Sequence, residues 1–189
     1  QTLAGGSGRV LRLPAVGLAQ SGEYRVVAAN VDPIEKKPIF HFKPGSLSFS
    51  IAAPGCNFKC RFCQNADIAQ MAADHNGRIM GRKISPKEIV SDAVKGGCKT
   101  IAFTYTEPTV FFELAFATAQ IAHQHDIKNV FVTNGYMSPE ALEMIAPFLD
   151  AANVDLKAFS DDFYKKMCGA RLAPVLETLR LMKQKGVFV

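Results

Sequence analysis

The sequence lacks several features that would place it in a common class of protein. No apolar run in its 189 residues approaches the roughly 18 residues that a membrane-spanning helix requires. Its 22 lysines and arginines give a net charge of +5, but they are scattered singly or in pairs. This scatter indicates solvated surface rather than a nucleic-acid-binding stripe. Because 48% of the residues are hydrophobic, the chain can form one domain with a substantial core.

Cysteine is scarce outside one short segment. Five cysteines are an odd number, and no stretch resembles a signal peptide, so a secreted disulfide scaffold is disfavoured and a reducing cytoplasm is expected. No second Cys-x2-Cys pair and no His-x3-His is present, which weakens a zinc site. We expect Cys98 and Cys168 to be packing residues or incidental thiols. His123 and His125 fall near a helix end and are expected to be solvated or packing residues.

The remaining three cysteines form the most informative motif. Cys56, Cys60 and Cys63 stand in the run Gly-Cys-Asn-Phe-Lys-Cys-Arg-Phe-Cys-Gln over residues 55–64. Three thiolates on one loop can hold one cubane iron–sulfur cluster, which usually takes four cysteines. One iron would then have no protein ligand and could bind and activate another molecule. Packing cysteines, a disulfide, or a zinc ribbon completed by Cys98, Cys168 or a histidine are the alternatives.

From residue 47 onward, strand patterns alternate with helix patterns. The run Ser-Pro-Lys-Glu over residues 85–88 is a typical helix start, with a capping serine and a proline in the first turn. Regular alternation predicts right-handed crossovers, parallel strands and outer helices, hence an α/β architecture. Strands are expected at 47–52, 100–106, 129–133, 152–156 and 187–189, and helices at 85–95, 109–125, from 138 and at 174–185. Two short strands are also possible at 9–13 and 24–29.

Polar residues follow the expected strands at their carboxyl ends, where ligands bind in such folds. The cysteine loop follows the first strand and Glu107 the second. Thr133 and Asn134 end the third, and Asp155 to Lys157 end the fourth. This coincidence predicts that these positions form a single site.

The cysteine triplet, with an aromatic residue just before its last cysteine, resembles the cluster loop of radical S-adenosylmethionine (SAM) enzymes. The resemblance implies a partial (βα) barrel and a [4Fe–4S] cluster held by Cys56, Cys60 and Cys63. The open iron would bind SAM, with Phe62 near the adenine. Reductive cleavage of SAM would yield a 5'-deoxyadenosyl radical that abstracts hydrogen from substrate. The alternative function is a non-catalytic iron–sulfur protein, either an electron carrier or a sensor.

Other residues extend the resemblance. Glu107 and Pro108 match the end of the Gly-Gly-Glu-Pro motif that contacts the SAM amine in this family, while Tyr105 and Thr106 replace its glycines. The run Asp155-Leu-Lys157 is similar to that of the pyruvate formate-lyase activating enzyme, where the Asp and Lys lie beside SAM. The same enzyme shares Thr133, Asn134 and Gly135, but carries an acid where this chain has Val132. That acid belongs to a monovalent-cation site next to SAM.

A further similarity covers residues 31–65, which resemble the radical SAM proteins that accompany Memo-like and AMMECR-like proteins. These proteins are activase-like, which implies an electron donor such as flavodoxin or ferredoxin and a possible protein substrate, but no nucleic acid and no membrane. The resemblance divides the chain into an N-terminal extension at 1–46 that covers the barrel and a radical SAM core at 47–189. Because 187–189 begins a fifth strand without a successor, we expect the core to be incomplete, to bind SAM weakly and to turn over slowly.

Overall fold

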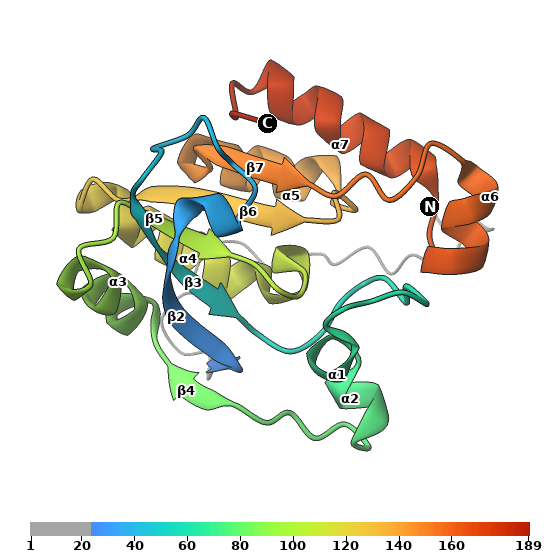
Figure 1. Cartoon of the computed structure of the whole chain (residues 1–189), viewed down its shortest axis with the longest axis horizontal. Helices are drawn as coiled ribbons and strands as arrows, with labels where there is room; N and C mark the ends of the chain where they lie inside the picture. Colours follow the sequence, from blue (N-terminus) through green and yellow to red (C-terminus); the bar gives the residue numbers. More distant parts are fainter. Residues whose placement is uncertain (1–23) are drawn as a thin grey trace.

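The computed structural model describes residues 24–189, which fold around a five-stranded sheet (Figure 1). β3 (Leu47–Ala52), β5 (Thr100–Phe103), β6 (Lys128–Thr133) and β7 (Ala151–Val154) lie side by side in that order and run parallel. β2 (Ala28–Pro33) adds an antiparallel edge strand next to β3. The predicted α/β fold with a mostly parallel sheet is confirmed, and β2 is an exception to the expected parallel order.

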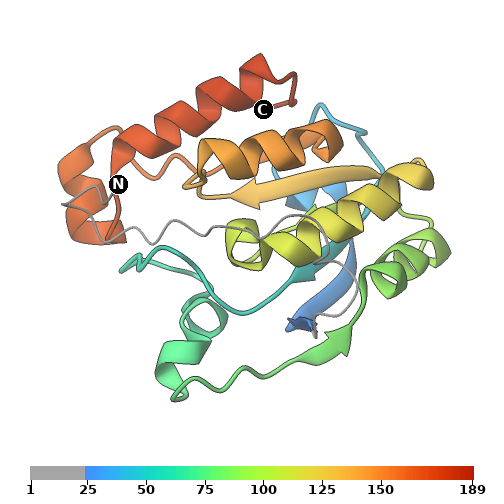
Figure 2. The same ribbon diagram turned by 180° about the vertical axis from the view of Figure 1, so that it is seen from behind.

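Helices cover one face of this sheet (Figure 2). They are α3 (Pro86–Lys95), α4 (Phe112–Gln124) and α5 (Pro139–Ile145), and α7 (Leu172–Gln184) packs beside α5. Alternate strand residues such as Ile51, Ile101 and Phe131 point to these helices and are fully buried in one apolar core. The predicted capping box at Ser85 and Glu88 is present, with reciprocal hydrogen bonds that begin α3.

Several predicted boundaries shift, and short elements appear that the pattern did not indicate. The strand expected at 24–29 is two strands, because β1 (Tyr24–Val26) pairs with β4 (Arg82–Ile84) while β2 pairs with β3. The strand expected at 187–189 is reduced to one bridge between Phe188 and Ala151. The strand expected at 9–13 lies outside the described residues. The short helices are η1 (Ile34–Lys36), α1 (Ala66–Ala69), α2 (Met71–Asp74), η2 (Pro108–Phe111), η3 (Ala146–Phe148), α6 (Asp161–Phe163) and η4 (Tyr164–Cys168).

The sheet face opposite the helices is closed in part by the segment that joins β2 to β3. Ile34 and Ile39 pack there against small residues of the sheet. Beside them Asp32 accepts hydrogen bonds from Lys37 Nζ at 3.1 Å and from the hydroxyls of Ser50 and Tyr105 at 2.8 Å. Lys37 is only 1% exposed, so Asp32 is the counterion that makes its burial tolerable. Within residues 24–189, no helix is both long and apolar enough to cross a membrane.

This buried ion pair gives a prediction for stability. Asp32→Ala should lower the free energy of unfolding by about 3–5 kcal/mol, because it leaves the Lys37 ammonium buried without a counterion. Lys36→Ala removes the other, solvent-exposed partner of Asp32 and should cost less than about 1 kcal/mol. Urea unfolding followed by circular dichroism measures both. Equal losses in the two variants would contradict the assignment of the buried pair as the stabilising one.

Candidate functional site

A cavity of about 470 Å³ opens at the carboxyl ends of the four parallel strands. In Figure 1 these ends point toward α1, α2 and α6. The loops that follow β3, β5 and β7, together with the end of β6, all contribute to its lining. The structure therefore brings together every site residue that the sequence indicates: Cys56, Cys60, Phe62, Cys63, Glu107, Thr133, Asn134, Asp155 and Lys157. Their individual roles stay predictions.

The cysteine loop is held in place by a segment far away in the sequence. The backbone N–H groups of Lys59 and Arg61 donate to the carbonyls of Cys168 and Met167, each at 2.9 Å. Phe58, which is 2% exposed, packs edge-on against Tyr136 and Tyr164. The loop is thus fixed by Phe58, Lys59 and Arg61, while its three cysteines line the cavity.

The three thiols come from one loop and line the same cavity. Within residues 24–189, no three Cys, His, Asp or Glu side chains are grouped closely enough to hold one metal ion. A cubane cluster needs a wider spacing, because each thiolate binds a different iron. Cys56 Sγ accepts a hydrogen bond from the N–H of Phe58 at 3.4 Å, an interaction that favours a thiolate. The donor set therefore fits a cluster better than the mononuclear zinc alternative.

Burial opposes ionisation of these thiols when no metal is bound. It is the largest effect that raises the pKa of Cys56, and burial and a hydrogen bond with Cys168 raise the pKa of Cys60 to about 12. Coordination to a metal reverses this preference, since a coordinated thiol is deprotonated. Metal binding is thus what would convert these thiols to thiolates.

Asn134 joins the cysteine loop to the end of β6. Its side-chain Nδ2 donates to Asn57 Oδ1 at 2.7 Å and lies 3.7 Å from Cys56 Sγ. Asn57 in turn donates to the carbonyl of Tyr136 at 3.0 Å. The next residue, Gly135, has φ +72°, and an added Cβ would lie 2.8 Å from Val154 Cγ1, so the turn requires glycine. The Thr-Asn-Gly run therefore connects the end of β6 to the cysteine loop through side-chain hydrogen bonds.

Glu107 is the most buried charged group of the cavity, at 1% exposed. Its Oε1 accepts from the N–H and hydroxyl of Thr109, at 3.1 and 2.7 Å, and from the Thr133 hydroxyl at 2.7 Å. Among residues 24–189, its Oε2 accepts from the N–H of Asn134 alone, at 2.8 Å. Burial raises the pKa of this carboxyl, and the four hydrogen bonds oppose that shift. No Lys or Arg among the described residues forms an ion pair with Glu107, and Oε2 keeps a lone pair free.

Asp155 and Lys157 form an ion pair at the cavity rim, with Lys157 Nζ 2.7 Å from Asp155 Oδ2. Burial would lower the pKa of Lys157, but the hydrogen bond and charge of Asp155 outweigh it and raise this pKa. The backbone N–H of Lys157 donates to the Tyr164 hydroxyl at 3.0 Å, which fixes the loop after β7. Phe62 lies across the cavity and packs on Phe163, with ring centroids 5.8 Å apart.

The residues that we expected outside the site lie outside it, although one of them, Cys168, adjoins a cysteine of the site. Cys98 is buried in the main core, and His123 contacts Asp150 and the ring of Phe148. Cys168 is buried but adjoins Cys60, a proximity that the sequence did not indicate. A larger hollow of about 970 Å³ lies between α3 and α4. It is lined by Ser85, Pro86, Lys87, Ala117, Gln120, Ile121, His123, Gln124 and Phe148, and this described lining contains no thiol or carboxylate.

Several residues at the site escaped the sequence reasoning, and three of them are informative. Asn57 lies inside the cysteine motif, and its position next to Cys56 was the one feature of the sequence that could have indicated its place in the site. Tyr105 lines the cavity and has φ +69°, an uncommon conformation for a residue other than glycine. It replaces a glycine of the family motif, which could have indicated this conformation. Lys36 reaches the cavity from η1, and no pattern pointed to it.

Comparison with known proteins identifies the class of this fold and site. Residues 50–189 match the Radical SAM superfamily, and the chain belongs to this family. Members of the family use a [4Fe–4S] cluster and SAM, so the predicted cofactors are confirmed at the level of the family.

The chain is also similar to individual proteins in sequence and to solved structures in fold. The chain is 45% identical over 168 residues to the uncharacterized protein MJ0808 of Methanocaldococcus jannaschii, covering 89% of this chain and 49% of that protein. It thus spans about half the length of this curated relative. The fold is similar to QueE from Escherichia coli, with a TM-score of 0.56, 13% identity, and coverage of 86% and 74% of the two chains. It is also similar to SAM-bound SuiB from Streptococcus suis, with a TM-score of 0.52, 17% identity, and coverage of 82% and 33%.

The contact between Asn134 and Asn57 can be tested in the metal-free protein. A double-mutant cycle of Asn57→Ala and Asn134→Ala should show a coupling of about 0.5–1.5 kcal/mol in urea unfolding, because each variant removes the same hydrogen bond. A cycle of Asn57→Ala with Ser85→Ala, a distant helix cap, should be additive. Additivity in the first cycle would mean that the two asparagines are not linked.

Proposed function

We propose that this chain is the cofactor-binding part of a radical enzyme. In this proposal Cys56, Cys60 and Cys63 hold a [4Fe–4S] cluster, and SAM binds beside it. The cluster supplies the electron that cleaves SAM to methionine and a 5'-deoxyadenosyl radical for hydrogen abstraction. The observation that supports this most is the convergence of three thiols, a buried carboxylate and a lysine on one cavity in a radical SAM family member.

Glu107 supports a role in binding the amine of SAM. A carboxylate at 1% exposure is costly unless its charge is compensated, and the described residues give it hydrogen bonds but no counterion. An incoming ammonium group would supply that charge, and Oε2 has an unused lone pair to accept from it. Asp155 and Lys157 would contact the carboxylate or ribose of SAM, and Phe62 the adenine. Thr133 and Asn134 would orient Glu107 and the cysteine loop.

More specifically, we propose that the enzyme is activase-like, because the run Asp155-Leu-Lys157 is similar to the Asp-Leu-Lys run of the pyruvate formate-lyase activating enzyme. The absence of an acid at Val132 argues against a complete monovalent-cation site. A non-catalytic electron carrier or sensor is the second candidate, and Glu107 disfavours it, because an electron carrier would need no buried carboxylate in the cavity that its cysteines line. The proposed setting is the cytoplasm, with a protein electron donor and a substrate that can be a protein.

The first test concerns the cluster. Anaerobic reconstitution should give about four irons per chain. Alanine replacement of Cys56, Cys60 or Cys63 should abolish the absorbance and electron paramagnetic resonance (EPR) signals of the cluster. Cys98→Ala and Cys168→Ala should retain the cluster. Loss of the cluster in either of these two controls would overturn the three-ligand assignment.

The second test concerns SAM. Glu107→Ala should weaken SAM binding by at least about tenfold, because it removes one charge-assisted hydrogen bond worth roughly 1.5–3 kcal/mol. Asp155→Ala should also weaken it, and both variants should keep their iron. Equilibrium binding of SAM, with 5'-deoxyadenosine formation after dithionite reduction, measures the effect. Glu113→Ala, at a half-buried carboxylate of α4 outside the cavity lining, is the matched control. Unchanged SAM affinity in both site variants would show that Glu107 and Asp155 have only a structural role.

A further inference from the structure

The thiols of Cys60 and Cys168 lie next to each other, although the two residues are about 100 positions apart in the sequence. The N–H groups of Lys59 and Arg61, on either side of Cys60, donate to the carbonyls of Cys168 and Met167 at 2.9 Å. Backbones in such contact lie about 5 Å apart, as in paired strands, and a disulfide joins residues whose Cα atoms are about 4.4–6.8 Å apart. The placement of the two cysteines therefore fits a disulfide.

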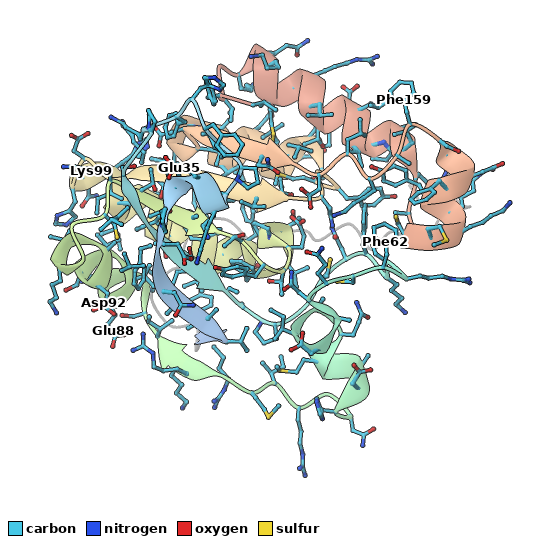
Figure 3. All side chains as sticks on the ribbon, viewed as in Figure 1. Glu35, Phe62, Glu88, Asp92, Lys99 and Phe159 are labelled. Atoms are coloured by element: carbon cyan, nitrogen blue, oxygen red, sulfur yellow. The ribbon has the colours of Figure 1, made fainter. Side chains whose placement is uncertain are left out.

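Packing holds the two segments in this position. Phe58 packs edge-on against Tyr164, whose hydroxyl accepts from the N–H of Lys157. Figure 3 shows Phe62, two residues beyond Cys60, beside the segment that carries α6 and η4. Because both segments are fixed by these contacts, the two thiols are neighbours without any movement of the cysteine loop.

The two thiols differ in their access to the cavity. Cys60 lines the cavity and is half-buried, whereas Cys168 is 0% exposed and is not part of the lining. A reagent that enters the cavity therefore meets Cys60 first, and Cys168 lies behind it. An accessible cysteine next to a second, resolving cysteine is the arrangement that converts an oxidised thiol into a disulfide.

We propose that Cys60 and Cys168 form a reversible disulfide when the cluster is lost under oxidising conditions, and that this disulfide blocks reloading of the cluster. The second half of the proposal rests on the proposed function, because it requires Cys60 as a cluster ligand. The oxidant is a peroxide, in the simplest case hydrogen peroxide.

The oxidation takes place in two steps. Cys60 Sγ attacks one oxygen of hydrogen peroxide, the O–O bond breaks, and a sulfenic acid and one water form. Cys168 Sγ then attacks the sulfur of the sulfenic acid, an S–S bond forms, and a second water leaves. In total, two electrons and two protons pass from the two thiols to the peroxide. A thiol reductant opens the bond again by exchange.

The disulfide has two consequences for the site. It removes one of the three proposed cluster ligands, and it holds Cys60 in a reversible state, since sulfinic and sulfonic acids form irreversibly. Burial raises the pKa of the Cys60 thiol, so this thiol reacts more slowly than an activated thiolate. Such a reaction suits protection during oxidative damage rather than rapid signalling.

Two pairings within the cysteine loop compete with this one, Cys60 with Cys56 and Cys60 with Cys63. Cys56 Sγ accepts from the N–H of Phe58 at 3.4 Å and lies 3.7 Å from Asn134 Nδ2, so it has other partners. Cys168 is the thiol that hydrogen-bonds to Cys60, which favours it over both loop cysteines.

The test uses cluster-free protein with its five thiols reduced. The protein is treated with hydrogen peroxide for hours at mildly alkaline pH, blocked with N-ethylmaleimide and digested with trypsin. Cleavage after lysine and arginine places each cysteine on its own peptide, so mass spectrometry of linked peptides identifies the pair; the expected link joins residues 60–61 to residues 167–171. A disulfide that closes a loop of about 100 residues also speeds migration on a non-reducing denaturing gel, which a pairing within the cysteine loop does not.

Reloading is measured separately, as transfer of a [4Fe–4S] cluster from a carrier protein in the absence of free thiol and sulfide. We expect the oxidised parent to show the linked peptides and to take up at least about tenfold less cluster, because one of its three ligands is missing. Dithiothreitol, removed before the transfer, should restore uptake.

The variants separate Cys168 from a general effect of oxidation. In Cys168→Ala and Cys168→Ser the fast-migrating band should be absent, and more of Cys60 should reach sulfinic acid, so dithiothreitol should restore less uptake than in the parent. Uptake by both variants before oxidation shows that they fold. Cys98→Ala removes another buried thiol and should behave as the parent does.

Several results would overturn the proposal. They are a link from Cys60 to Cys56 or Cys63 instead, oxidation of Cys60 to sulfinic acid without any link, unchanged cluster uptake by the oxidised parent, and full recovery of uptake in the Cys168 variants. The link is read from peptide mass and gel migration without a cluster. A protein that forms it but takes up no cluster even before oxidation would refute the proposed function and leave the disulfide in place.

Discussion

The buried carboxylate of Glu107 is the constraint on which the rest of the site depends. Its Oε1 is shared by Thr109 at the start of η2 and Thr133 at the end of β6, and its Oε2 accepts from Asn134. One side chain therefore ties the ends of two neighbouring strands together. Asn134 then extends the connection to Asn57 in the cysteine loop. The thiols are thus positioned by this chain of hydrogen bonds together with the backbone bonds from the loop to residues 167 and 168, and not by the cysteine spacing alone.

The local strain around Glu107 is consistent with a site that is held by its surroundings. Tyr105 has φ +69°, which costs a residue other than glycine of order 1–3 kcal/mol. Its hydroxyl donates to Asp32, whose carboxylate also pairs with the buried Lys37. Through Asp32, the antiparallel strand β2 therefore holds the turn that carries Glu107. The segment before the first parallel strand thus contributes to the position of the cofactor pocket.

Sequence reasoning recovered the parallel strands and grouped the site residues, because both depend on local rules. Hydrophobic patterns and caps marked β3, α3 and α7, and parallel strands place their carboxyl-end residues at one edge of the sheet. It failed where a contact joins distant segments. Strand β2 was assigned to an extension because its pairing with β3 is set by tertiary contacts, and the split at Val27 has no local marker. The packing of the cysteine loop on η4, and the proximity of Cys168 to Cys60, likewise depend on partners about 100 residues apart in sequence.

The charge buried in the cavity and the charges on the outer side of the cysteine loop act over different distances. Inside the cavity, Glu107 is shielded from water, so its charge acts on a cationic group that enters the pocket and little on anything outside. On the surface, Lys59 and Arg61 are solvated, and their field reaches only about one Debye length, near 10 Å at 0.1 M salt. One short loop therefore presents its thiols to the cavity and its cations, Lys59 and Arg61, to solvent.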